Sequence, residues 1–342
     1  MPSRRTRVLI ALTIAVGAFT YLTSATWIEQ RAIGAQAPRL ATSQSVAHHV
    51  DRDQLMRDLR TLADPGLEGR LTGSSGGRKA RAWIEAQFGA IGLAPAGVAG
   101  FRQPFDFTHR SVRGFFLPGR PFRTEYRDAA NVLGRIDGTV GDARVIVVSA
   151  HYDHVGVRDG LVYPGADDNA SGVAVLLAVA RQLRTNAPRH PMLLVAFDAE
   201  ELGLRGAEAL VGSSLLPVGT IALNINLDMV SRNDDNEIFA AGTHQTPTLR
   251  PILDDVQGRS AVRVLFGHDR PMAKAGSVED WTTQSDHGVF YEAGVPYIYF
   301  GVVDHDDYHQ PTDTVDKVNP KFFGDVADMI VEAVGTLDRS LP

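Results

Sequence analysis

The sequence contains no cysteine. Disulfide bonds, thiolate zinc sites and catalytic thiols are therefore excluded, and any metal ion must be held by nitrogen and oxygen ligands. There is also no long run of like charges, no internal repeat and no low-complexity tract, and the formal net charge of −6 argues against a general nucleic-acid surface. With 44% hydrophobic and 22% charged residues, the chain has the composition of a globular protein with a buried core.

The N-terminal segment has the form of an export signal. Three arginines within the first seven residues precede an apolar stretch from Val8 to about Tyr21, and small residues suited to a cleavage site follow. We therefore expect residues 1–25 to be a signal peptide or, because the apolar stretch is about long enough to span a bilayer, a membrane anchor. Residues 26–50 read as a linker. Both alternatives place the rest of the chain outside the cytoplasm, in a periplasmic or extracellular location.

Residues 51–342 are expected to form a single domain, with an N-terminal lead-in at 51–128 and a catalytic core at 129–338. Within the core, short apolar runs alternate with segments whose apolar residues recur at helical spacing. This alternation predicts an α/β fold, in which a mixed, mainly parallel twisted sheet is sandwiched between helices in three layers.

Residues able to hold a metal ion follow four of the predicted strands. Arg144–Ala150 leads into His151, Met192–Phe197 into Glu200 and Glu201, Ile221–Leu227 into Asp228, and Val295–Phe300 is followed by Tyr308 and His309. A fifth element, Gly165–Gly172, carries Asp168 and opens a helix. Because ligands bind outside the carboxyl ends of the strands in open α/β sheets, we expect these side chains to converge there.

Five residues are candidate metal ligands: His151, Asp168, Glu201, Asp228 and His309. Five protein ligands are too many for one tetrahedral catalytic zinc, which takes about three protein ligands and a water. They suit two metal ions about 3.5–4 Å apart that share one carboxylate. Asp168 is the natural bridge if it lies centrally, at the start of a helix that faces the strand ends.

Two further acids are expected to act beside the metals. Glu200 and Glu201 are adjacent and cannot be equivalent ligands, so one can bind metal while the other accepts a proton from the attacking water. Asp153 lies two residues after His151, where it is expected to accept the second imidazole N–H and fix the tautomer of the ring.

Five motifs occur in an order and spacing that resemble the M28 family of co-catalytic zinc metallopeptidases, of the aminopeptidase type. They are His151-Tyr-Asp153, Gly165-Ala-Asp167-Asp168-Asn169-Ala-Ser171-Gly172, Glu200-Glu201-Leu-Gly203, Asn226-Leu-Asp228-Met229 and Tyr308-His309-Gln-Pro-Thr-Asp313-Thr314. The resemblance runs from about Asn131 to the C-terminus. Singly, each motif is a weak signal, but all five in order form a strong one.

The resemblance implies a zinc-exopeptidase-like fold, two Zn²⁺ ions and peptide substrates with a free N-terminus. Nitrogen and oxygen ligands also accept Mn or Co. The implied roles are a bridge for Asp168, one ion for Glu201 and His309, the other ion for His151 and Asp228, the general base for Glu200 and stabilisation of the oxyanion for Tyr308. A cis peptide bond between Asp168 and Asn169 is also implied.

Ordinary structural interpretations exist for single residues, since Asp168 and Asp228 could cap a helix or a turn. They do not explain why all four strand ends carry ligand types. We interpret several neighbouring polar residues as loop and supporting residues rather than ligands: His154, Asp167, Asp304, His305, Asp306 and Asp307.

Three alternative functions remain open on this scaffold. A carboxypeptidase would need an arginine cluster for the substrate carboxylate, for which Arg205, Arg232 and Arg270 are candidates. A single-zinc glutaminyl cyclase is disfavoured because both His151 and Asp228 are present, and a catalytically dead binding domain because no ligand position is missing. Side-chain specificity and oligomeric state are left open by the sequence.

Overall fold

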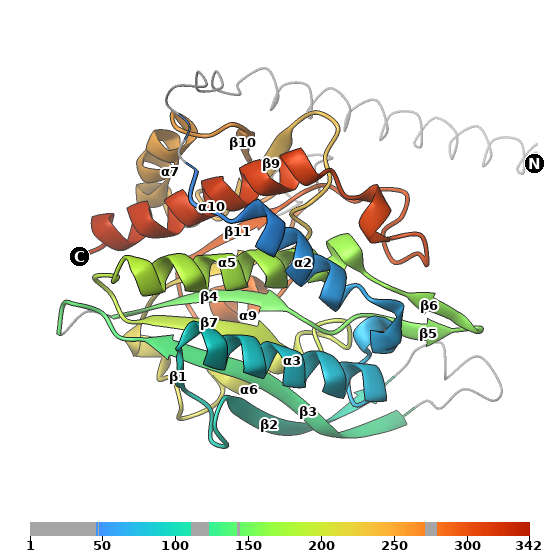
Figure 1. The fold of residues 1–342 in the computed structure, drawn as a ribbon. Coiled ribbons are helices and arrows are strands. Elements are labelled where there is room, and N and C mark those ends of the chain that lie inside the picture. Colours follow the sequence, from blue (N-terminus) through green and yellow to red (C-terminus); the bar gives the residue numbers. More distant parts are fainter. Residues whose placement is uncertain (1–45, 47, 111–122, 142–143, 271–278) are drawn as a thin grey trace, which may run out of the picture.

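The computed structural model describes residues 46, 48–110, 123–141, 144–270 and 279–342 (Figure 1). The predicted signal or anchor segment and most of the predicted linker lie outside these residues. Within the described part of the chain, no helix combines the length and the apolar character needed to cross a bilayer.

A mixed sheet forms the middle of the molecule, and its main path runs β1-β3-β7-β4-β8-β11-β9-β10. In chain order the strands are β1 (Ala94–Pro95), β2 (Arg102–Arg110), β3 (Arg123–Ile136), β4 (Val145–His151), β7 (Met192–Phe197), β8 (Ile221–Leu227), β9 (Glu237–Ala241), β10 (Arg263–Phe266) and β11 (Tyr297–Gly301). The four central strands β7, β4, β8 and β11 are parallel. β2 and β3 pair antiparallel at one side, and β9 pairs antiparallel with β11 at the other.

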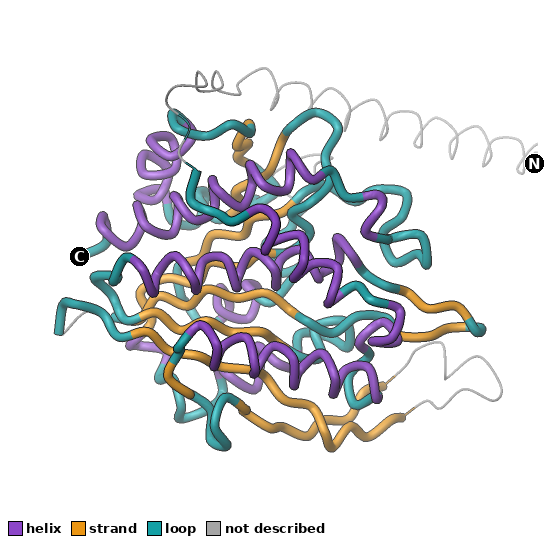
Figure 2. Tube along the Cα trace, in the orientation of Figure 1, coloured by secondary structure: helices purple, strands orange, loops and turns teal. Residues whose placement is uncertain are grey.

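Helices cover both faces of this sheet (Figures 1 and 2). One face packs against α2 (Arg52–Leu62), α3 (Ser75–Ile91), α5 (Gly172–Thr185), α7 (Arg250–Gln257) and α10 (Pro320–Ser340), and the other against α6 (Arg205–Val211) and α9 (His287–Glu292). Side chains of β4 alternate between the faces: Ile146 and Val148 belong to the first core and Val147 to the second. The three-layer fold predicted from the sequence is thus confirmed.

The lead-in shares the sheet and core of the rest of the chain. Its β2 pairs with β3, and α2 is tied to α5 by a partly buried ion pair of 2.6 Å between Asp58 and Arg181. β2 lies off the main path of the sheet, and its partner within the described residues is β3.

Local sequence explains why the elements begin and end where they do. The six residues of β7 are all apolar and all buried, as expected for an inner strand whose two faces are both covered by helices. Helix α10 begins at Pro320, where the missing N–H costs nothing, and the Asn319 side chain accepts hydrogen bonds from the first turn.

The main element missed by the sequence pattern is a short hairpin between His151 and Asp168. It consists of β5 (Gly156–Arg158) and β6 (Leu161–Tyr163), which pair only with each other. Three-residue strands carry too few residues for an alternation to show. The hairpin projects beyond the sheet (Figure 1).

Candidate metal centre

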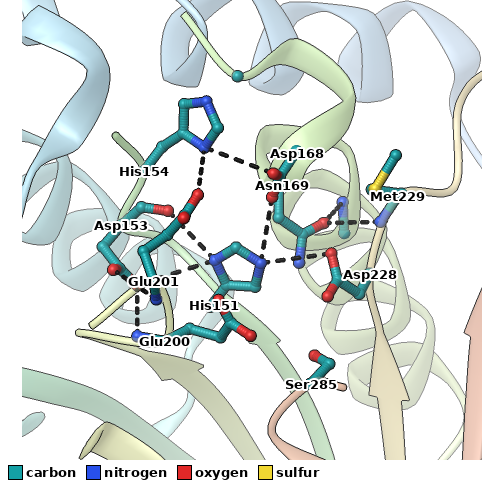
Figure 3. Close-up of polar contacts among 12 residues, drawn as sticks. His151, Asp153, His154, Asp168, Asn169, Glu200, Glu201, Asp228, Met229 and Ser285 are labelled. Atoms are coloured by element: carbon teal, nitrogen blue, oxygen red, sulfur yellow. Dashed lines mark hydrogen bonds and ion pairs between the residues drawn. The ribbon is translucent and has the colours of Figure 1, made fainter. Parts of the chain in front are cut away.

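All five predicted ligands meet beyond the carboxyl ends of β4, β7, β8 and β11. The structure divides the ligand-type side chains into two groups, one of His154, Asp168, Glu201 and His309 and one of His151, Glu200 and Asp228. Within each group, one ligand atom of every residue lies within 4.8 Å of the others. Most of these side chains can be followed in Figure 3.

The carboxylate of Asp168 lies between the two groups. Its Oδ1 is 3.4 Å from Nε2 of His151, and its Oδ2 is 3.0 Å from Nε2 of His309. In the group that contains His151, Nε2 of this residue is also 3.3 Å from Oδ1 of Asp228. Each oxygen of Asp168 therefore faces a different group, which is the arrangement that a bridging carboxylate requires.

The loop that carries Asp168 is fixed by hydrogen bonds from several elements. The Asp313 carboxylate accepts from the backbone N–H groups of Asp167 and Asp168 at 3.1 Å, and the Asn169 side chain donates to the carbonyl of Leu227 at the end of β8. The peptide bond between Asp168 and Asn169 is cis, as the resemblance implies. Gly165, with φ of 56°, must be glycine because a Cβ would lie 2.0 Å from the carbonyl oxygen of Asp168.

No role in the site was predicted for Arg70, but it ties this loop to the end of β4. Its guanidinium is fully buried and donates hydrogen bonds to backbone carbonyls. The acceptors are Leu62, Tyr152, Pro164 and Gly165. Burial lowers the pKa of Arg70 to about 10, so the group stays charged at neutral pH. The segment Leu67-Glu-Gly-Arg70 resembles the N-terminal lead-in of the M28 family, but this weak resemblance indicates no contact for the arginine.

Asp153 supports the site differently from the prediction. The carbonyl oxygen of Asp153, and not its carboxylate, accepts from Nδ1 of His151 at 3.1 Å; the nearest carboxylate oxygen is 3.8 Å away. The carboxylate instead accepts from the backbone N–H groups of Glu200 and Glu201, at 3.0 and 3.3 Å. Because β4 ends at His151, the backbone of Asp153 is free of the sheet, and its carbonyl takes the contact that was expected for the carboxylate.

The adjacent glutamates have opposite electrostatic surroundings. Burial raises the pKa of Glu200 well above its usual range, with help from the charges of Asp228 and Asp286 and against the effect of His151. Burial and Asp168 also act to raise the pKa of Glu201, but His154 and His309 outweigh them and lower it to about 2. When their surroundings shift the pKa values of two neighbouring carboxylates in opposite directions, the two groups usually have different roles, one in acid–base chemistry and one as a ligand.

His154 departs most from the sequence interpretation, which placed it among the loop residues. It is completely buried, and its Nδ1 lies 2.7 Å from Oε1 of Glu201 and 3.6 Å from Oδ2 of Asp168. Figure 3 shows it on the side of Glu201 that faces away from His151. Its position three residues after His151 was the only signal in the sequence, and that spacing alone does not distinguish a ligand from a loop residue.

The other polar residues set aside as non-ligands stay outside both groups. His305 contacts Oδ2 of Asp167 at 3.1 Å, and Asp307 pairs with Arg232 at 2.8 Å. Asp167 in turn accepts hydrogen bonds from the backbone and hydroxyl of Ser231, which connects the Asp168 loop to the segment after β8. These residues brace the loops that carry the ligands.

A pocket opens onto the second group and the bridge. Its lining includes His151, Asp168, Glu200, Asp228 and His309, and it continues over Met229, Glu279, Trp281, Gln284, Tyr299, Val302, Asp304 and Tyr308. Tyr308 stacks on His309, with ring centroids 4.0 Å apart, so its ring lies beside the ligands as expected. Among the described residues, no hydrogen-bond partner of its hydroxyl indicates a role for it.

The donor set fits a pair of zinc ions. All the donors are imidazole nitrogens or carboxylate oxygens, which zinc accepts at about 2.0–2.2 Å. Within the described residues, the buried Oε1 of Glu201 has no hydrogen-bond partner although His154 and His309 lie within 3.1 Å. Buried polar atoms of this kind need an explanation, and a shared cation between them supplies one.

The family model for peptidase family M28 matches residues 131–334, which is more than half of the chain and contains every predicted ligand. This chain belongs to peptidase family M28. Among its relatives in the family, aminopeptidase YwaD of Bacillus subtilis (strain 168) is 30% identical over 199 residues. That match covers 56% of this chain and 40% of YwaD, so the chain spans less than half the length of this relative.

Two solved structures resemble the M28 fold of this chain. The zinc aminopeptidase BSAP of Bacillus subtilis is 18% identical, with a TM-score of 0.60 over 83% of this chain and 94% of that one. The glutaminyl cyclase of Porphyromonas gingivalis is also 18% identical, with a TM-score of 0.65 over 84% of this chain and 99% of that one. At this identity the likeness shows the fold alone, and an aminopeptidase and a cyclase share it.

Proposed function

We propose that this M28 protein is a two-zinc aminopeptidase that hydrolyses the first peptide bond of substrates with a free N-terminus. The observation that carries the proposal is the position of Asp168, whose two carboxylate oxygens face two separate groups of ligand-type side chains. A pair of zinc ions held there would supply an activated water and polarise the scissile carbonyl. YwaD, the relative with 30% identity, is named an aminopeptidase.

Glu200 is the proposed general base. It lines the pocket, whereas the backbone N–H of the same residue is held by Asp153. The carboxylate takes a proton from the attacking water and returns it to the leaving amine. Tyr308, stacked on His309 at the pocket wall, is proposed to donate its hydroxyl proton in a hydrogen bond to the oxyanion of the tetrahedral intermediate.

The charge of the pocket favours an aminopeptidase over a carboxypeptidase. Beyond the proposed ligands and base, its described lining includes the acids Glu279 and Asp304 and no lysine or arginine. Acidic walls attract a substrate ammonium and repel a substrate carboxylate. The three arginines considered for a carboxylate clamp lie elsewhere: Arg205 pairs with Glu208, Arg232 pairs with Asp307, and Arg270 does not line the pocket.

The test compares substrates that differ only at their ends. Leucine p-nitroanilide should be hydrolysed, its N-acetyl derivative should not, and a peptide with an amidated C-terminus should be cleaved as well as one with a free carboxylate. A chelator should abolish turnover and zinc should restore it. Turnover that persists in chelator, or a preference for N-blocked peptides with a free C-terminus, would refute the proposal. Ammonia release from an N-terminal glutaminyl peptide would indicate a cyclase instead.

We also propose that the enzyme is exported and acts in the periplasm or outside the cell. This rests on the arginines and the apolar stretch of residues 1–25 alone. Cell fractionation with a C-terminal tag tests it, and N-terminal sequencing of the mature protein distinguishes a cleaved signal from a retained membrane anchor. Recovery of all the protein in the cytoplasm would contradict export.

A further inference from the structure

We propose that His154 is a metal ligand, so that one zinc ion is held by four protein residues and the other by three. The four are His154, Asp168, Glu201 and His309, and the three are His151, Asp168 and Asp228. This inference rests on the proposed two-zinc centre but adds a residue to it. It predicts that the two ions differ in coordination and in affinity.

The first support is distance. Nδ1 of His154 is 2.7 Å from Oε1 of Glu201 and 3.6 Å from Oδ2 of Asp168, while Nε2 of His309 is 3.1 and 3.0 Å from the same two oxygens. Ligands bound at about 2.0–2.1 Å in a tetrahedron lie about 3.3 Å from one another. The four measured distances scatter around that value, and the two histidines approach the same pair of oxygens.

The second support is the direction of the ring. Although Nδ1 of His154 is 2.7 Å from Oε1 of Glu201, neither atom has a hydrogen bond of acceptable geometry within the described residues. An imidazole that supported Glu201 from outside would point an N–H at the oxygen. Here the close approach lacks that alignment, as expected when both lone pairs point at a common ion between them.

The third support is that the ring is held in place. His154 is completely buried, and a Cβ on Gly165 would lie 2.5 Å from its Cδ2. The absence of a side chain at Gly165 therefore leaves room for the ring of His154. Gly165 lies shortly before the bridging Asp168 in the chain. A buried polar ring without hydrogen bonds is costly in a folded protein, and coordination to a cation offsets that cost.

The position of His154 also explains how the two ions divide their work. His154 does not line the pocket in the described part of the chain, whereas His151, Asp228 and the proposed base Glu200 do. Four protein ligands close a zinc site, while three leave a position open to water and substrate. The ion beside His154 is thus the more tightly held one, and the ion beside Glu200 keeps the open position.

X-ray absorption on the two-zinc protein tests the inference directly. Three histidines shared by two ions give an average of one and a half imidazoles per zinc, whereas two histidines give one. The His154→Ala variant should lower the average from one and a half to one. A wild-type average of one imidazole per zinc would overturn the assignment.

Zinc titration of the metal-free protein in competition with a chelating dye gives a second readout. Loss of a residue that only supports a ligand weakens zinc binding by about 10–100-fold, so His154→Ala should weaken the tighter zinc by more than about 100-fold. His154→Asn places an oxygen near the position of Nδ1 and should recover part of the affinity. If the affinity for the more tightly bound zinc ion were unchanged in both variants, the assignment would be overturned.

His190→Ala is the matched control, because His190 is also buried but contacts Asp338 far along the chain from the site. It should leave both affinities and the imidazole count unchanged. Failure of this inference is distinguishable from failure of the proposed function. A protein that binds two zinc ions and cleaves leucine p-nitroanilide, with one imidazole per zinc, remains an aminopeptidase in which His154 is not a ligand.

Discussion

The two halves of the metal centre are built from neighbouring residues but differ in charge and access. His154 and His309 lower the pKa of Glu201 to about 2, while burial, helped by Asp228 and Asp286, raises the pKa of Glu200 well above its usual range despite His151. Glu200 lines the pocket and His154 does not. One half is thus suited to holding a cation and the other to exchanging a proton.

This comparison shows how a single turn can separate two identical side chains. The chain leaves β7 and turns at Ala199, whose φ is 60°, and both glutamate N–H groups then bind the carboxylate of Asp153. With the backbone held in this way, consecutive side chains point in different directions. The surroundings of each side chain then determine the chemistry of its carboxyl group.

The largest expected effect comes from removing the negative charge of one glutamate at a time. Glu200→Gln should lower kcat by about 10²–10⁴-fold, because the proton acceptor is lost, while the zinc content stays at that of the wild type. Glu201→Gln should instead lose zinc, since it removes a ligand charge. Steady-state kinetics and elemental analysis on both variants measure this. If Glu200→Gln lost zinc and activity together, the two halves would not be divided as we describe.

Removing the buried guanidinium of Arg70 should disturb both halves through the loop that they share. Arg70→Met leaves four backbone carbonyls without their donor, and unsatisfied buried acceptors cost about 1–3 kcal/mol each. We expect a loss of about 3 kcal/mol or more in the free energy of unfolding, measured by urea denaturation. Arg57→Met, at an exposed position on α2, should change the free energy by less than about 0.5 kcal/mol.

Asp153→Asn tests whether one carboxylate positions both glutamates. The amide presents an N–H₂ group to one of the two backbone N–H donors, so the turn should shift and kcat should fall by about 10–100-fold, as for other residues that orient ligands. The zinc content should fall less than in Glu201→Gln. Asp137→Asn, which changes an exposed acid, is the control. If Asp153→Asn had the kinetics of the wild type, the turn at Glu200 and Glu201 would not depend on the Asp153 carboxylate.

The smallest effect concerns His287, the first residue of α9, whose ring packs against Tyr299 of the pocket lining. Burial lowers its pKa to about 4, and its Nε2 donates to the carbonyl of Trp281. The unfolded state binds a proton near pH 6.5, so this histidine costs stability as the pH falls from about 6.5 towards 4. Its contribution should be a loss of about 2 kcal/mol between pH 7 and pH 5.

His287→Gln preserves the donor at the position of Nε2 but does not titrate, so it should flatten the dependence of unfolding free energy on pH in this window. Urea denaturation at several pH values measures it. A variant with the same pH slope as the wild type would show that other groups cause the loss.

Much of the catalytic core was predictable because its strands are short, apolar and buried. The bounds of β7 and β8 agree with the sequence pattern, and the ligands that follow the strands converge as expected. The predicted opening of a helix at Gly165–Gly172 is only partly right. Asp168 and Asn169 have non-helical backbone angles, and regular helix begins at Gly172.

By itself the sequence determined the order of the strands along the chain and the residue types at their ends, because burial in a sheet and metal coordination both impose strong residue preferences. The tertiary structure alone decided the contacts of Arg70, the carbonyl of Asp153 as the partner of His151 and the place of His154 beside Glu201. These depend on how loops from distant parts of the chain fold over one another, and the loops carry no periodic pattern from which their paths can be read.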